Sequence, residues 1–147
     1  MSDPKHYVLG FAFNSAKDHI VLIYKNRPDW QAGKINGIGG KVERGEIPVF
    51  SMEREFFEET GVVTHFHNWK QFATLIFGND ILGGKALIHC FKFIGDECMQ
   101  ASTYEDEDVE TFAIKDIWDK PLIGHLHFLI PMAMDDTFKY ADLHMQS

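Results

Sequence analysis

The segment between Pro48 and Gly61 constrains the fold more than any other part of the sequence, because its apolar residues follow a helical period. Val49, Met52 and Phe56 fall at i, i+3 and i+7 and form one apolar stripe. Pro48 suits the first helical turn, and Gly61 suits the residue that follows the last turn. The sequence therefore predicts one amphipathic helix between these two residues.

Most other apolar runs are short and typical of strands. They are expected at Tyr7–Phe13, Ile20–Tyr24, Ile35–Ile38, Val62–Phe66, Gln71–Phe77, Ala86–Ile94 and Glu110–Ile114. The glycine-containing residues 78–84 are expected to connect two of these strands. A second helix is predicted at His125–Met134, with Pro131 at a kink or boundary. We find no repeat or linker, so residues 1–147 are predicted to form a single α/β domain.

The charge balance excludes some partners. The chain has 14 basic and 22 acidic residues, a formal net charge of −8, which disfavours binding along a nucleic-acid polymer. A small phosphorylated substrate is compatible with this charge if metal ions neutralise the acidic site. The thirteen phenylalanines predict a core filled largely by aromatic packing.

Localisation is expected to be cytoplasmic. The apolar run near the N-terminus is short and predicts a first strand rather than a signal peptide. No run approaches the roughly 20 apolar residues of a membrane helix, so no membrane association is expected. Cys90 and Cys98 lack the spacing of a zinc site. They are interpreted as two reduced thiols, with one disulfide as the alternative.

Three carboxylates share one arc of the predicted helix. Glu55, Glu58 and Glu59 lie within about 100° of one another, where a divalent cation would offset their repulsion. The alternative is a solvated acidic face. Just upstream, residues 39–46 contain three glycines and further carboxylates, and glycines let a backbone approach a phosphate or metal closely. This combination favours a metal site.

The run GKVERGEIPVFSMEREFFEETGV resembles the Nudix box, G-x5-E-x7-R-E-U-x-E-E-x-G-U, where U is a bulky hydrophobic residue. The fixed positions are filled by Gly40, Glu46, Arg54, Glu55, Glu58, Glu59 and Gly61. Phe56 and Val62 fill the U positions, where an aliphatic residue is commoner than Phe56. The resemblance implies an α/β/α sandwich with a mixed β-sheet. It also implies hydrolysis of a phosphoanhydride bond in a nucleoside diphosphate derivative.

The same resemblance assigns roles to these residues. The carbonyl of Gly39 and the carboxylates of Glu55, Glu58 and Glu59 would hold Mg²⁺, or Mn²⁺ in its place. Glu55, or a carboxylate outside the box, would help to deprotonate the attacking water. Arg54 would orient a glutamate through a bidentate ion pair, and Glu46 would support the loop.

One carboxylate outside the box is a further candidate. In several Nudix proteins a glutamate before a late strand completes the metal site or acts as base. Residues 105–108 are all acidic and precede the expected strand Glu110–Ile114, and Glu107 fits this role best by its spacing. The alternative is that these residues form a solvated acidic loop.

The sequence says less about the substrate. Residues 36–43 resemble the N-G-x-G-G-K-V-x motif of MutT-type enzymes that hydrolyse purine nucleoside triphosphates, which implies substrate contacts by Asn36 and Lys41. Asn36 could equally cap a local turn. Trp30, Tyr24 or Phe13 could stack on a base or simply pack.

The most favoured function is therefore a (d)NTP pyrophosphohydrolase of MutT type. The paired acids of some oxidised-purine hydrolases are not evident near Gly124 and His125, and the proline marker of ADP-ribose hydrolases is missing at Phe77-Gly78-Asn79. ADP-ribose and dinucleoside polyphosphates remain alternative substrates, and a non-catalytic nucleotide-binding module is an alternative from another class. Homodimers are common among Nudix proteins, so the resemblance also implies a homodimer as an oligomeric state of this protein.

Overall fold

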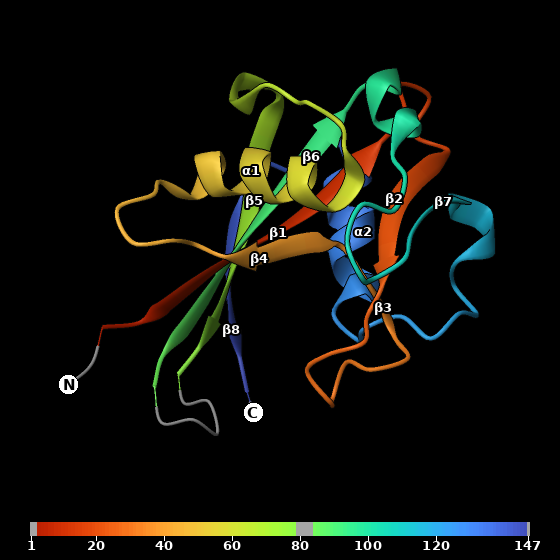
Figure 1. The fold of residues 1–147 in the computed structure, drawn as a ribbon. Helices are drawn as coiled ribbons and strands as arrows, with labels where there is room; N and C mark the ends of the chain where they lie inside the picture. Colours follow the sequence, from red (N-terminus) through yellow and green to blue (C-terminus); the bar gives the residue numbers. More distant parts are fainter. Residues whose placement is uncertain (1–2, 79–83, 147) are drawn as a thin grey trace.

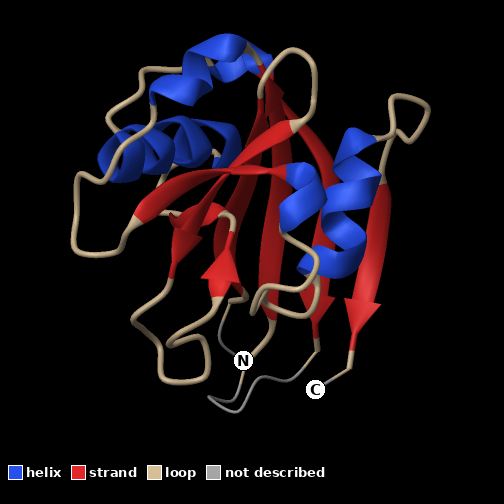
Figure 2. Cartoon of the chain, turned by 90° about the vertical axis from the view of Figure 1, so that its right-hand side faces the viewer, coloured by secondary structure: helices blue, strands red, loops and turns tan. Residues whose placement is uncertain are grey.

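A mixed eight-stranded β-sheet with α-helices on both faces forms the fold (Figures 1 and 2). The computed structural model describes residues 3–78 and 84–146. Two strand pairs are parallel, β1 with β6 and β5 with β8, and the other pairs are antiparallel. This architecture confirms the predicted α/β/α sandwich.

The elements alternate along the chain. The strands are β1 (Lys5–Phe13), β2 (His19–Tyr24), β3 (Ile35–Asn36), β4 (Ile38–Lys41), β5 (Trp69–Phe77), β6 (Ala86–Ile94), β7 (Val109–Ala113) and β8 (Ala141–Met145). The helices are α1 (Pro48–Thr60) and α2 (Leu126–Met134), and the 3₁₀ turns are η1 (Phe66–Asn68), η2 (Asp96–Gln100) and η3 (Ile114–Asp116).

Strand β1 lies at the centre of the sheet. One of its edges pairs along its whole length with β6, and the other is shared between β4 and the start of β2. The expected strand Ile35–Ile38 is accordingly split at Gly37 into β3, which pairs with β2, and β4, which pairs with β1. A Cβ at Gly37 would lie 2.8 Å from the carbonyl oxygen of Gly10, so the chain can cross between the two strands there because glycine has no side chain.

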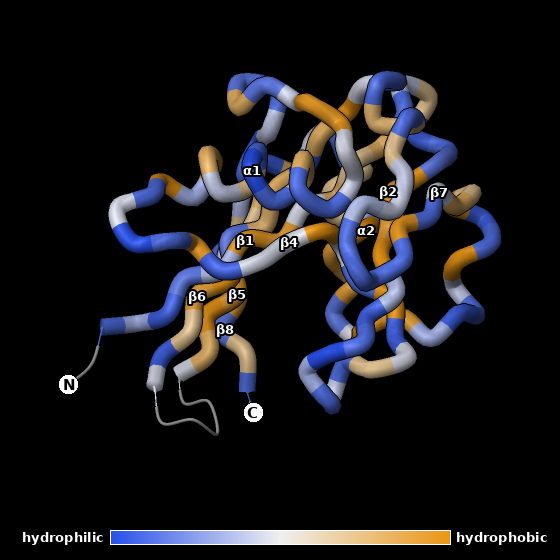
Figure 3. The backbone as a smooth tube through the Cα atoms, viewed as in Figure 1, coloured by the Kyte–Doolittle hydropathy of each residue, from blue (hydrophilic) through white to orange (hydrophobic). Residues whose placement is uncertain are grey.

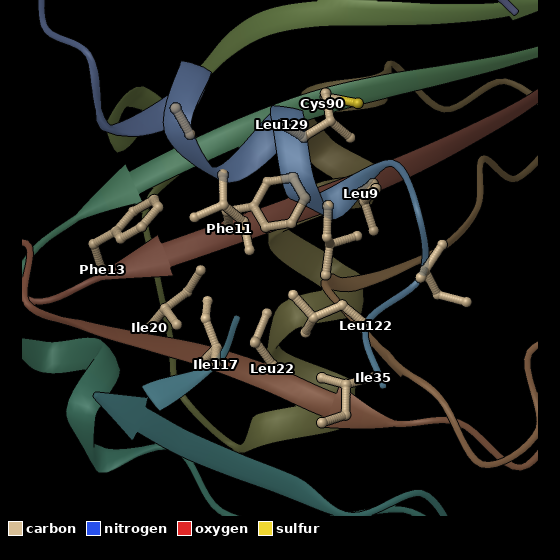
Figure 4. Close-up of a cluster of buried hydrophobic side chains, with 14 of the residues drawn as sticks. Leu9, Phe11, Phe13, Ile20, Leu22, Ile35, Cys90, Ile117, Leu122 and Leu129 are labelled. Atoms are coloured by element: carbon tan, nitrogen blue, oxygen red, sulfur yellow. The ribbon is translucent and has the colours of Figure 1, made fainter. Parts of the chain in front are cut away.

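Apolar side chains on the two faces of the sheet form two core clusters. On one face, Met52 and Phe56 of α1 pack against β1, β2 and the aromatic residues Trp69 and Phe93. On the other face, α2 packs against the cluster shown in Figure 4, which includes Phe11 and Leu22. Apolar residues follow the central strands and polar ones the outer loops (Figure 3). Five of the largest fully buried side chains are phenylalanines: Phe11, Phe13, Phe56, Phe72 and Phe93.

The prediction of a strand at Val62–Phe66 is wrong. Residues 62–65 form an irregular segment, and Phe66 begins η1. Thr64 is buried and accepts a hydrogen bond from Trp69 Nε1 at 2.8 Å. The imidazole of His65 then accepts a hydrogen bond from the backbone N–H of His67, which starts η1. Polar side chains thus bind local partners in place of a strand neighbour, and β5 begins at Trp69.

Strand β8 was not expected from the sequence. Its residues pair in parallel with Ala73–Phe77 of β5. The second helix spans Leu126–Met134 with Pro131 inside it, so its extent was predicted within one residue. Residues 79–83 of the predicted connection lie outside the described part of the chain.

Cys90 and Cys98 are both buried and free, so they form no disulfide. Burial raises the pKa of each thiol to about 12. Within residues 3–78 and 84–146, no helix is long and apolar enough to cross a membrane.

Candidate metal and catalytic site

Helix α1 carries the acidic side chains of the candidate site. It buries Ser51, Met52, Phe56 and Thr60 against the sheet, which leaves the glutamates on an adjacent arc. The helix ends at Gly61, whose φ of 76° places it in the left-handed region, and its N–H donates to the carbonyl of Phe57. A side chain there would also meet the ring of Tyr104. The helix boundaries thus agree with the sequence prediction, because they depend on local requirements.

The glycines of β4 bring the backbone against α1. A Cβ at Gly40 would lie 2.5 Å from the carboxyl carbon of Glu55, and a Cβ at Gly39 would lie 2.1 Å from the carbonyl oxygen of Val8. Both positions therefore require glycine for a close approach. Figure 1 shows β4 passing beneath α1. The carboxylate of Glu55 is thereby held directly over Gly40, in the segment of residues 39–46 that we call the glycine loop.

Arg54 connects the loop to the helix carboxylates. Its Nε and Nη2 donate to the two oxygens of Glu46 at 2.8 and 3.0 Å, which is a bidentate ion pair. Its Nη1 donates to Glu55 Oε1 at 2.9 Å and to Glu58 Oε1 at 3.0 Å. Its Nη2 also donates to the carbonyl of Lys41. Arg54 thus fixes the relative positions of three glutamates and of the loop backbone.

Glu46 faces the loop and not the open site. Besides its two bonds from Arg54, its Oε1 accepts hydrogen bonds from Ser51 Oγ at 2.5 Å and from the N–H of Glu43 at 3.1 Å. The bonds from Arg54 outweigh the effect of burial and lower the pKa of Glu46 to about 2. Glu46 therefore stays ionised and supports the loop.

Burial and like charges disfavour ionisation of Glu55 and Glu59, which are both half-buried. Burial raises the pKa of Glu55, and Arg54 partly offsets this effect. Burial raises the pKa of Glu59 to about 7, with further contributions from the charges of Glu105 and Glu55. Glu59 Oε2 is buried and has no hydrogen-bond partner among the described residues. A buried carboxylate oxygen without a partner is unfavourable unless a cation or donor binds it.

The donor set fits a hard divalent cation. Carboxylate and carbonyl oxygens are the ligands that Mg²⁺ prefers, and the unpartnered oxygen of Glu59 is available to it. Within the described ranges no three His, Cys, Asp or Glu side chains are already arranged around one point. The reason is visible in the contacts: Glu55 and Glu58 both turn toward Arg54 Nη1. The three glutamates still share one helix face, and the unpartnered oxygen of Glu59 is of the kind that Mg²⁺ prefers as a ligand.

Glu107 is buried, with 4% of its surface exposed, so the solvated-loop interpretation is wrong for this residue. Its Oε1 accepts a hydrogen bond from Lys25 Nζ at 2.8 Å, and its Oε2 accepts from the N–H of Asn26 at 2.6 Å. Burial alone would raise the pKa of Glu107, but these bonds outweigh it and the pKa is lowered. Glu107 thus anchors the loop between β2 and β3, and its charge acts on Glu59.

The structure also places Glu105, which the sequence interpretation passed over, near the site. Of the charged neighbours, Glu105 contributes most to the raised pKa of Glu59, and it also acts on Glu55. The sequence signal was the acidic run 105–108 itself. Spacing alone could not tell which of its members turns toward α1.

The two residues expected to bind substrate, Asn36 and Lys41, differ in burial. Asn36 is buried: its Oδ1 accepts from the N–H of Gly37 at 2.8 Å, and its Nδ2 donates to Gln31 at 3.1 Å, so its amide stabilises a local turn. The side chain of Lys41 is exposed beside the glycine loop. The structure therefore does not bring Asn36 and Lys41 together through a direct contact.

The aromatic candidates differ in exposure. Phe13 is fully buried and packs in the core, and the ring of Tyr24 packs against Phe112. Trp30, in the loop that Glu107 anchors, is 59% exposed. Of the three, Trp30 is the most exposed, and Tyr24 is partly buried.

The fold and the sequence both match known proteins. The chain matches the NUDIX domain over residues 4–127. A comparison with curated protein sequences finds no match. The MutT protein from Bacillus halodurans superposes with a TM-score of 0.71 at 18% identity, covering 97% of this chain and 90% of that one.

Two other similar structures contain bound nucleotides. The NUDIX domain of NrtR from Shewanella oneidensis, complexed with ADP ribose, has a TM-score of 0.65 at 18% identity, covering 86% of this chain and 84% of that one. A bifunctional NMN adenylyltransferase/ADP ribose pyrophosphatase from Francisella tularensis, complexed with AMP and a Mn ion, has a TM-score of 0.66 at 19% identity. The alignment covers 90% of this chain and 42% of the bifunctional protein. The domain match and the shared fold show that the chain belongs to the NUDIX family and has a fold like that of MutT proteins.

Proposed function

We propose that this protein is a hydrolase that cuts a phosphoanhydride bond in a nucleoside diphosphate derivative and uses Mg²⁺, or Mn²⁺ in its place. The observation that carries the proposal is the buried, unpartnered Oε2 of Glu59. It lies on the same helix arc as Glu55 and Glu58, beside a glycine loop that a phosphate can approach. A cation bound to this oxygen would sit where it can also bind the phosphates of a substrate.

Each residue has a distinct role in the proposed reaction. Glu55, Glu58 and Glu59, with the carbonyl of Gly39, would hold the cation. The cation supplies charge neutralisation and a lowered pKa of bound water. Arg54 keeps the carboxylates in place through its contacts with Glu46, Glu55 and Glu58. The catalytic base is Glu55 or a carboxylate outside the helix.

Glu105 and Glu107 are the two candidates for that outside carboxylate. Glu107 already accepts bonds from Lys25 and from the backbone, so it is the better positioning residue. Glu105 is exposed and acts electrostatically on Glu59. We therefore favour Glu105 as the group that receives a proton and Glu107 as the group that holds the β2–β3 loop.

For the substrate we favour a (d)NTP, hydrolysed as MutT-type enzymes do. The resemblance of residues 36–43 to the MutT motif and the MutT-like fold support this choice. Trp30 in the β2–β3 loop and Lys41 at the end of β4 are exposed and are available to contact a nucleotide. ADP-ribose is the second candidate, because two proteins of similar fold are described with ADP ribose or its hydrolysis.

Product release measured over a panel of nucleotides with Mg²⁺ tests the proposal. The panel contains dNTPs, ADP-ribose and dinucleoside polyphosphates, and the products are separated by chromatography. Glu59→Gln is expected to lower the rate by several orders of magnitude while the fold is retained. Glu53→Gln, with the same charge change on the same helix, is the matched control and is expected to be near normal. Tight binding of a nucleotide without turnover would instead establish the non-catalytic module.

A further inference from the structure

A cavity lies on the face of the sheet that packs against α2, beyond the C-terminal end of that helix. It has a volume of about 540 Å³ and is lined by Lys70, Lys92 and Lys139, with Phe72 and Phe138 as apolar walls. We call it the lysine cavity. Its volume falls within the range of small-molecule sites, which is roughly 300–1,000 Å³. Its charged lining comprises three lysines and one aspartate, Asp136, in a protein of net charge −8.

Two of the lysines oppose each other directly. Lys70 of β5 and Lys92 of β6 are cross-strand partners in an antiparallel pair. Like charges in this position destabilise a sheet. The pKa of Lys92 is lowered by burial, and the positive charges of Lys17 and Lys70 add to this against the opposite effect of Asp136 and Asp135. The two ammonium groups therefore repel each other, and a bound anion would offset this repulsion.

The nearby carboxylates of Asp135 and Asp136 are already paired with other residues. Asp136 forms an ion pair of 2.7 Å with Lys17, and Asp135 accepts hydrogen bonds from Thr137. Lys92 Nζ donates to the carbonyl of Ala133, at the C-terminal end of α2. Neither Lys70 nor Lys139 forms an ion pair with any residue that the structure describes. The cavity thus retains uncompensated positive charge.

The lysine cavity is separated from the candidate catalytic site by the sheet. Side chains alternate between the two faces of a strand, and Lys92 lies on the face of Cys90, which packs with α2. The contact of Lys92 with Ala133 agrees with this placement. The carboxylates of α1 lie on the opposite face, so a ligand in the cavity would not touch them.

We propose that the lysine cavity binds an oligophosphate anion, either inorganic pyrophosphate or the phosphate chain of a nucleotide. Ammonium groups act as point charges for phosphate oxygens from several directions, whereas a single carboxylate would compensate only one of them. The apolar walls formed by Phe72 and Phe138 would exclude water from one side of the bound anion and so strengthen its attraction to the lysines. This proposal does not depend on the proposed hydrolase function.

Calorimetric titration with inorganic pyrophosphate, in EDTA and without divalent ions, tests the proposal. Under these conditions the carboxylates of α1 repel the anion. The pocket variant is Lys70→Gln/Lys139→Gln, and the control is Lys5→Gln/Lys115→Gln, which changes the net charge equally at two exposed lysines elsewhere. We expect the pocket variant to bind about tenfold more weakly or worse, the control to bind within about twofold of the wild type, and affinity to fall with salt.

A parallel titration with ATP distinguishes the two sources of the phosphate chain. Tighter binding of ATP than of pyrophosphate identifies a nucleotide, and equal binding identifies the phosphate chain alone. Thermal melting shows whether the variants fold, and the pocket variant is expected to be at least as stable as the wild type because a repulsion is removed. Equal affinity of wild type and pocket variant, equal loss in the control, or no binding of either anion by the wild type would each overturn the proposal.

Discussion

Replacing Glu46 by Gln removes the charge that holds the glycine loop to α1. Glu46 accepts four hydrogen bonds, from Arg54 Nε and Nη2, Ser51 Oγ and the N–H of Glu43. A glutamine amide can accept at one atom only, and its NH₂ would point at the guanidinium. We therefore expect the variant to be less stable at neutral pH.

The size of the effect follows from the lowered pKa. A change from 4.5 to about 2 corresponds to at most about 3 kcal/mol of stability at pH 7. Solvent reaches 19% of the Glu46 side chain and 25% of the Arg54 side chain, which screens their attraction. We expect a loss of about 2 kcal/mol in the free energy of unfolding, in the range for hydrogen bonds to charged groups.

The stability lost in Glu46→Gln should become smaller as the pH falls. Because the pKa of Glu46 is lower in the folded state, its stabilisation is fully present above about 4.5 and disappears as the pH falls through about 2. Glutamine does not titrate, so the difference between wild type and variant should shrink to about half or less between pH 7 and pH 3. Urea unfolding at several pH values, followed by tryptophan fluorescence, measures this difference.

Glu43→Gln is the matched control in the same loop. Glu43 lies 3.8 Å from Arg54 and its side chain is 68% exposed, so its loss should cost little. A difference for Glu46→Gln that stays constant from pH 7 to pH 3, or an equal cost for Glu43→Gln, would refute the reasoning.

Four further predictions concern Gly40 in β4, the loop between β2 and β3, the cation and the core. Gly40→Ala should lower activity at least about tenfold, because its Cβ would displace the carboxylate of Glu55; unchanged kinetics would contradict this close approach. Glu107→Gln should loosen the loop held by Lys25, seen as faster hydrogen exchange at residues 25–27, whereas unchanged exchange would exclude the anchoring role. EDTA should abolish hydrolysis and added Mg²⁺ should restore it, and full activity in EDTA would rule out a metal-dependent reaction. Phe56→Ala should cost about 3–5 kcal/mol in urea unfolding because Phe56 is fully buried, and a loss below about 1 kcal/mol would show that the core refills the space.

Local requirements made much of the site predictable from the sequence. Helix α1 and its end at Gly61 follow from a helical period and from a left-handed backbone position. The glycines at 39 and 40 are demanded by close approach of the backbone, and the seven fixed residues of the box have defined spacing. Such features depend on residues that are near in sequence, so the one-dimensional pattern contains them.

Other features depend on partners far away in the chain. Strand β8 exists because it completes the edge of β5, more than sixty residues earlier, and its own pattern is weak. Residues 62–66 have strand-like composition, yet Thr64 and His65 bond to local groups and no strand forms.

The acidic run 105–108 shows the same limit within the site. Glu107 is buried against Lys25 and Asn26, while Glu105 is exposed and acts on Glu59, although the two are chemically identical and two residues apart. By itself the sequence determined the family, the α/β fold class and the acidic helix. The tertiary structure decided which of these carboxylates is buried, which oxygen of Glu59 lacks a partner and where the lysines gather, because burial and charge depend on which distant segments meet.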